Sequence, residues 1–90
     1  MKRNALTSAQ IRAARALLRW SAEDLARECS LGVTTIRRAE LADDETSLTA
    51  ANELAVRRAL ESAGVIFIDE YGEGAGVLLR QRSSPKGRKG

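Results

Sequence analysis

Apolar residues recur every three or four positions through most of the first 63 residues, the spacing of helices that each bury one face. Each repeat follows a residue that can cap a helix. Thr7, with Gln10 three positions later, matches a capping box, and Ser21 and Thr49 are N-cap residues. Gly64 is a typical helix stop. The pattern predicts helices near residues 8–19, 22–29, 33–41 and 49–63.

The pattern changes after Gly64. Two short segments rich in β-branched and aliphatic residues flank a glycine-rich stretch, which predicts a hairpin with strands near 65–70 and 77–82. Both faces of the first strand are apolar, and an isolated hairpin is marginal in water. We therefore expect one face to lie on the helices, and the other face, or the edge of the hairpin, to meet the same hairpin of a second subunit. The expected dimer contact includes Ile66, Ile68 and Val77 or Leu78, with the fourth helix contributing.

Residues 21–41 carry the most specific pattern, two short helices joined by a tight turn. Leu25, Ala26 and Cys29 form an apolar stripe on the first of them, and Ser30-Leu31-Gly32 interrupts the periodicity. The second helix places hydroxyls and guanidinium groups on its outward side, at Thr34, Thr35, Arg37 and Arg38. Arginine binds guanine edges and the threonine methyl contacts thymine, so such a helix is suited to a DNA major groove.

This pattern resembles the helix-turn-helix of the lambda repressor/Cro-like family, also called XRE regulators. Leu25-Ala26, Leu31, Ile36 and Glu40 carry the resemblance, which spans about residues 10–64. It implies a mainly α fold: a four-helix lambda-repressor-like helix-turn-helix domain over residues 1–64, followed by a C-terminal β-hairpin over 65–82. Short members of the family carry such a strand pair.

The resemblance also assigns roles to single residues. In the family, an arginine on the first helix often pairs with a glutamate that ends the recognition helix, and Arg15 and Glu40 stand at those positions. We expect a partly buried structural ion pair there. Two positions depart from the family pattern: Ser30 replaces a left-handed glycine, and Ala22 replaces a glutamine that binds phosphate.

For DNA contact, the resemblance places Gly32 at the cap of the recognition helix, where its amide can meet phosphate. Val33, Thr34 and Arg37 or Arg38 would reach base edges, and two subunits would contact half-sites ~34 Å apart. Candidates for phosphate contact are Ser21, Thr35, Thr46 and Ser47. The loop before Thr46 is acidic, so either its carboxylates turn away from DNA or the loop lowers the affinity.

Charge is unevenly distributed along the chain. Residues 1–41 carry a net charge of +4, residues 42–79 of −6 and residues 80–90 of +5, which sums to the net +3 of the chain. We expect the acidic middle to face away from phosphate. Residues 83–90 contain no apolar side chain and are predicted to be a disordered basic tail. With 90 residues and three aromatic side chains, the core is thin, which favours dimerisation.

Several function classes lack their usual residues. The chain has no histidine and a single cysteine, Cys29, so we expect no enzyme activity, no cofactor and no metal site. No segment resembles a signal peptide or a membrane span, and we expect a cytoplasmic location. The sequence predicts a homodimeric, sequence-specific regulator of transcription that binds an inverted repeat in double-stranded DNA. The alternative is a protein-interaction module, such as an antitoxin or an antiactivator that occupies another regulatory protein.

Overall fold

A computed structural model of the chain describes residues 6–42, 46–68 and 75–80. Within them, four helices precede a two-stranded antiparallel hairpin, which confirms the predicted fold class. The elements are α1 (Ser8–Leu18), α2 (Ala22–Cys29), α3 (Val33–Leu41), α4 (Ala50–Ser62), β1 (Val65–Ile68) and β2 (Gly76–Leu79). The helices begin and end within one residue of the predicted positions. The predicted strand ends at 70 and 82 lie outside the described residues.

Capping side chains set where three helices begin. The Thr7 hydroxyl accepts a hydrogen bond from the Gln10 amide, and the Gln10 side chain accepts one from the Thr7 amide, which completes the predicted capping box. Ser21 and Asp24 form a second capping box at the start of α2. Thr49 caps α4. These bonds satisfy backbone N–H groups that a helix leaves without an internal partner.

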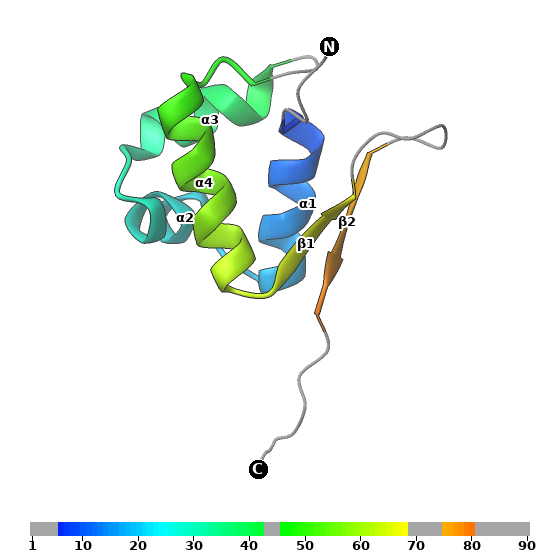
Figure 1. The fold of residues 1–90 in the computed structure, drawn as a ribbon. Coiled ribbons are helices and arrows are strands. Elements are labelled where there is room, and N and C mark those ends of the chain that lie inside the picture. Colours follow the sequence, from blue (N-terminus) through cyan, green and yellow to red (C-terminus); the bar gives the residue numbers. More distant parts are fainter. Residues whose placement is uncertain (1–5, 43–45, 69–74, 81–90) are drawn as a thin grey trace.

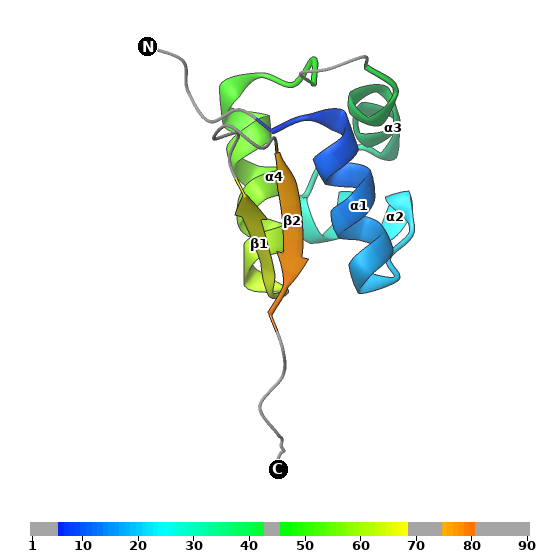
Figure 2. The same cartoon turned by 90° about the vertical axis from the view of Figure 1, so that its right-hand side faces the viewer.

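The hairpin covers one side of the helices. In Figure 1 it lies beside α1, and Figure 2 shows it from the outside, with α3 on another side of the molecule. β1 packs against α4, and β2 packs against α1. The core that joins these layers is aliphatic, and its largest fully buried side chains are Leu6, Ile11, Leu25, Ile36, Val56 and Leu60.

The register of the hairpin separates its two faces. Val65 pairs with Leu79, Ile66 with Leu78, Phe67 with Val77 and Ile68 with Gly76. Alternate side chains of a strand point to opposite faces, so Val77 shares the inner face with Phe67, and both pack against the helical core. Of the two residues predicted as alternatives for the dimer contact, Val77 turns its side chain toward the helices and Leu78 turns its side chain outward. The outer face carries Ile66, Ile68 and Leu78, all exposed.

Gln10 attaches the hairpin to the first helix. Its side chain is buried, and its Nε2 donates to the backbone oxygens of Ile68, at 3.2 Å, and Gly76, at 3.1 Å. These carbonyls belong to the last residue pair of the hairpin, at the end where the connection between β1 and β2 begins. One amide group therefore caps α1 through its oxygen and binds both strands through its nitrogen.

Replacing this amide by a carboxylate should weaken the attachment. We expect Gln10→Glu to lower the free energy of unfolding by about 2 kcal/mol, because the carboxylate keeps the capping bond but faces two carbonyl oxygens without a proton to donate. Urea denaturation at fixed protein concentration measures the loss. Asn52→Asp makes the same chemical change at the third position of α4, where the side chain forms no hydrogen bond within the described residues, and it should shift stability by less than about 0.5 kcal/mol. Equal stability of both variants would contradict the role of Gln10.

Candidate nucleic-acid interface

An ion pair between α1 and the end of α3 underlies the candidate interface. Arg15 Nε donates to Glu40 Oε2 at 2.6 Å, and Arg15 donates a second bond through Nη2 to Glu40 Oε1 at 2.9 Å. The Glu40 side chain is 8 % exposed and the Arg15 side chain 24 %. The hydrogen bond that Arg15 donates to Glu40 raises the pKa of Arg15 against the opposing effect of burial. The structure thus contains the ion pair that the sequence predicts.

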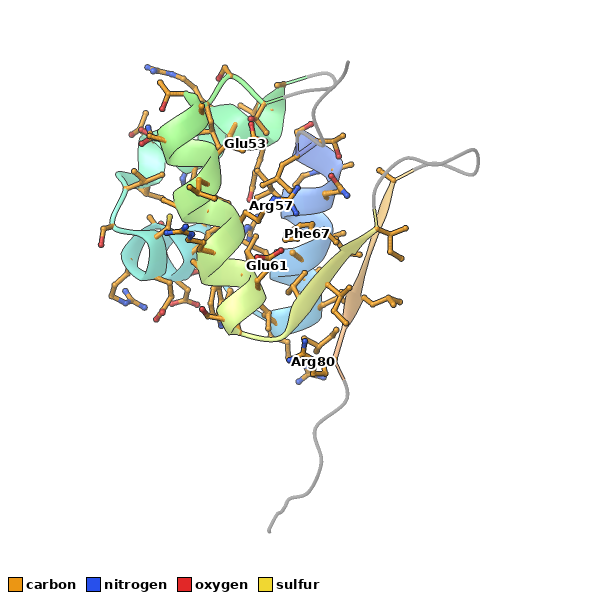
Figure 3. All side chains as sticks on the ribbon, in the orientation of Figure 1. Glu53, Arg57, Glu61, Phe67 and Arg80 are labelled. Atoms are coloured by element: carbon orange, nitrogen blue, oxygen red, sulfur yellow. The ribbon has the colours of Figure 1, made fainter. Side chains whose placement is uncertain are left out.

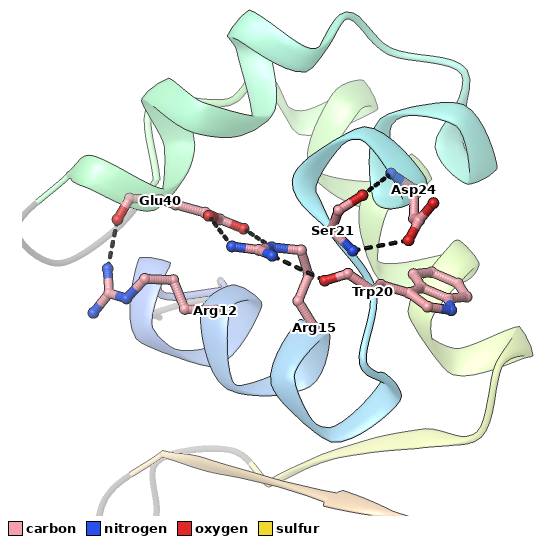
Figure 4. A network of polar contacts seen from close by, with 6 residues as sticks. All are labelled: Arg12, Arg15, Trp20, Ser21, Asp24 and Glu40. Atoms are coloured by element: carbon pink, nitrogen blue, oxygen red, sulfur yellow. Dashed lines mark hydrogen bonds and ion pairs between the residues drawn. The ribbon is translucent and has the colours of Figure 1, made fainter.

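Two further hydrogen bonds extend this pair into a network, drawn in Figure 4. Arg15 Nη1 donates to the backbone oxygen of Trp20 at 2.9 Å, which links the network to the junction of α1 and α2. Arg12 donates to the backbone oxygen of Glu40, an acceptor at the C-terminal end of α3. No pattern in the sequence predicts this role for Arg12. The position of α3 against α1 is therefore fixed by both the side chain and the main chain of Glu40.

The turn between α2 and α3 contains a residue in the left-handed region. Ser30 has φ 61° and ψ 38°, the conformation that the family resemblance implies for a glycine at this position. Its backbone N–H donates to Arg27, and the next amide, of Leu31, donates to Ala26. These bonds end α2 and direct the chain into Gly32, which precedes α3.

The outer face of α3 places the candidate base-contacting residues together. Thr34 and Arg38 are exposed, and Val33 and Thr35 are half-buried. Gly32 is the N-cap of α3 and lacks a side-chain cap, so no side chain covers the first amides of this helix among the described residues. Open amides at a helix start attract anions, including phosphate.

The two neighbouring arginines of α3 differ in their partners. The Arg37 guanidinium donates to the carboxylate of Glu23 in the first turn of α2. The pKa of Glu23 is lowered, first by a backbone hydrogen bond at the start of its helix and then by the charge of Arg37. Arg38 forms no hydrogen bond or ion pair with any other described residue. The sequence left Arg37 and Arg38 as alternatives, and Arg38 is the one whose charge is available.

A small polar hollow lies between α3 and the start of α4. It has a volume of about 100 Å³ and is lined by Thr35, Arg38, Ser47, Leu48, Thr49 and Asn52. Three predicted DNA-contacting residues therefore line one concavity, although the sequence separates Ser47 from the other two. Asn52 adds an amide that the sequence analysis did not assign. The one sequence feature that could have indicated Asn52 is its position three residues after the cap Thr49.

Two other predicted phosphate contacts, Ser21 and Thr46, are not among the residues that line this hollow. Ser21 is exposed at the start of α2, and its hydroxyl oxygen already accepts the Asp24 amide at 3.0 Å. Thr46 is half-buried, and its hydroxyl accepts the Leu48 amide at 3.4 Å. Both hydroxyls keep a proton that can be donated to phosphate. The acidic residues 43–45 lie outside the described residues, as does the basic tail.

Among residues 6–42, 46–68 and 75–80, His, Cys, Asp and Glu never gather in threes or more as they would around a metal ion. Cys29 is buried, and burial raises the pKa of its thiol. In the described part of the chain, no helix combines the length and the apolar character that crossing a membrane requires.

Comparison with known proteins adds no family assignment, since the chain matches no protein-family model and no curated protein.

Removing the carboxylate of the buried ion pair should cost more stability than removing the carboxylate of the exposed pair. We expect Glu40→Ala to lower the free energy of unfolding by about 3 kcal/mol, because it leaves the guanidinium of Arg15 partly buried without its carboxylate. Glu23→Ala breaks the exposed pair with Arg37 and should cost clearly less, because water screens an ion pair at the surface. Thermal and urea denaturation of both variants measure the difference. An equal loss in the two would mean that burial of the Glu40 pair has no special role.

Because the backbone at Ser30 is strained, a substitution at this position should raise stability. We expect Ser30→Gly to raise the free energy of unfolding by about 1 kcal/mol, since glycine adopts the left-handed conformation without a Cβ clash. The matched control is Gly64→Ala, which introduces a Cβ at φ 109° and should be destabilising. Chemical denaturation checks both signs. A destabilised Ser30→Gly variant would contradict the description of this turn.

Proposed function

We propose that the chain binds double-stranded DNA in a sequence-specific manner and acts as a homodimeric regulator of transcription. The observation that carries the proposal is the available guanidinium of Arg38, which lines the same hollow as the hydroxyl-bearing residues Thr35 and Ser47. A cation and hydrogen-bond donors on one face of a short helix match the groups that DNA recognition uses. The resemblance of residues 10–64 to lambda repressor/Cro-like regulators points to the same function.

The position of α3 supports this assignment. Glu40 is bound at the C-terminal end of the helix by Arg12 and Arg15, and Ile36 and Ala39 are fully buried. The helix therefore presents its outer face on a fixed support, as base recognition by direct contact requires. Gly32, at the other end, leaves amides that can bind a phosphate group.

Residues at the two ends of α3 would make different contacts with DNA. Thr34 and Val33 lie in the first turn, where a helix entering the major groove meets base edges. Arg38 lies one turn later and can contact either a guanine edge or the adjacent phosphate. Ser47 and Asn52, from the segment before α4 and its first turn, line the hollow from the other side and are suited to phosphate contact.

Neighbouring arginines provide a matched test of the proposal. On a duplex enriched from a random library, we expect Arg38→Ala to reduce affinity by about 1–3 kcal/mol and to relax the preference at one base pair. Arg37→Ala removes the same charge from the same helix, but this arginine is already paired with Glu23, so the loss should be clearly smaller. Fluorescence anisotropy titrations measure both. Equal losses on the enriched duplex and on random DNA would reject base recognition by α3.

A protein-interaction module remains the second candidate, because the outer face of the hairpin exposes Ile66, Ile68 and Leu78. Salt separates the two functions. Phosphate contacts release counterions, so the affinity of a DNA-binding regulator falls steeply between low and moderate salt. An antitoxin or antiactivator would instead show weak DNA binding without sequence preference, together with a tight protein complex that is insensitive to salt.

A further inference from the structure

The two edges of the hairpin differ in what their backbone groups can bind. The Arg80 amide donates to the Gly64 oxygen at 2.7 Å, so these residues form a hydrogen-bonded pair just beyond the ladder. Such pairs alternate along an antiparallel ladder, and the register then places Ile66 and Leu78 in the next hydrogen-bonded pair. The N–H and C=O groups of Val77 and Leu79 consequently point away from β1, toward the free edge of β2.

Charged side chains of α4 lie beside β1, on the side of the strand that faces this helix. The guanidinium of Arg57 lies 4.9 Å from the centre of the Phe67 ring, and Arg57 also pairs with Glu61 at 3.5 Å. Figure 3 shows these three residues beside α4 and β1. Charges at a strand edge are a common means of preventing pairing with another chain.

Within the described residues, no ion pair or ring contact places a charged side chain against β2. Its residues from Gly76 to Leu79 are uncharged, and within the described residues no hydrogen bond outside the ladder reaches the backbone of Val77 or Leu79. An uncharged strand with free backbone groups is a template for another strand. The free backbone groups of β2 need a partner that offers backbone hydrogen bonds, because an apolar surface alone would leave these groups unbonded.

Exposed apolar side chains lie on both faces of the sheet beside this edge. Leu78 is 53 % exposed on the outer face, whereas Leu79 is 41 % exposed on the inner face. Leu17 of α1 is 42 % exposed, and it lies seven positions after Gln10, on the side of α1 that holds the hairpin. If two subunits instead packed the outer faces of their hairpins together, Leu78 would be covered but Leu79 and Leu17 would stay exposed to water. A strand added next to β2 would cover residues on both faces.

We propose that a second copy of this chain supplies that strand, so that two β2 strands pair antiparallel about a two-fold axis at Leu78 and form a four-stranded sheet. In this register Val77 of each copy stands opposite the partner's Leu79, and each pair exchanges both backbone hydrogen bonds. The two Leu78 side chains meet at the axis, in a pair without hydrogen bonds, where Cα atoms approach most closely. The proposal specifies the dimer contact of the proposed function and rests on it.

The same register suits the residues at the ends of β2. Each Arg80 stands opposite the partner's Gly76, which has no side chain to collide with it and carries no charge. If the two-fold axis passed through Val77 or Leu79, only the residue on the axis would stand opposite its own copy. The other edge residue would then stand opposite neither Val77 nor Leu79 of the partner. Centring on Leu78 therefore uses both free pairs of backbone groups, and it keeps the two Arg80 residues at opposite ends of the paired segment.

A matched pair of lysine substitutions tests this arrangement. Leu78 and Ile68 are both exposed on the outer face, but Leu78 lies on the proposed axis and Ile68 lies on β1, one strand away from the edge. In sedimentation at micromolar concentration without DNA, we expect the wild-type chain to be a dimer. Leu78→Lys should raise the dissociation constant by more than about tenfold, because two like charges would stand directly opposite each other. Ile68→Lys should leave it within about threefold, and circular dichroism checks that both variants fold.

Amide hydrogen exchange provides a second measurement on the unmodified chain. We expect the N–H groups of Val77 and Leu79 to be protected in the dimer and to lose protection in Leu78→Lys, whereas that of Phe67, a half-buried residue of β1, stays exchangeable in both. A monomeric wild type, dissociation by both lysine variants, or protection of Phe67 in place of Val77 and Leu79 would overturn the proposal. Because these measurements contain no DNA, their outcome does not depend on whether Arg38 contacts DNA, which the affinity measurements test separately.

Discussion

The Arg15–Glu40 ion pair is the interaction on which the arrangement of the helices depends. α3 has nine residues, and its buried residues are Ile36, Ala39 and Glu40. One of its three buried residues therefore carries a carboxylate, which is unfavourable in the interior unless a cation binds it. Arg15 supplies that cation through two hydrogen bonds. Alternative placements of α3 that separate this pair would bury an unpaired charge, so the pair selects one orientation of the helix.

This constraint connects the core to both proposed surfaces. Fixing α3 against α1 exposes the side of α3 that carries Thr34 and Arg38, and it leaves the opposite side of α1 to Gln10 and the hairpin. α1 is thus the shared support, with arginines on the side toward α3 and a glutamine on the side toward the strands. A dimer joined through β2 would use a side of the molecule other than the one that presents α3, as the arrangement in Figure 2 allows.

The elements were predictable from the sequence because their signals are local. Caps at Thr7, Ser21 and Thr49 and the apolar periodicity predicted all four helices, and the ion pair followed from the family resemblance. Relations between distant residues were not predictable. The pairing of Arg37 with Glu23 joins two helices, so no local pattern distinguishes Arg37 from Arg38.

The face of the hairpin to which Val77 belongs depends on strand register, and a shift of one residue exchanges the faces. From the sequence, either alternate set of β2 side chains could face the helices, and no residue of the strand indicates which set does. The second function of Gln10 was likewise hidden, because its capping role already accounted for its presence in the sequence.

Backbone NMR of the isotope-labelled chain, titrated with duplex DNA at low and moderate salt, is the most direct test of the central claim that the outer face of α3 binds DNA. The account predicts salt-sensitive shifts of the amide signals of residues 32–38 and 46–52, with much smaller changes at β1 and β2. Shifts confined to the hairpin, or no shifts at low salt, would contradict it.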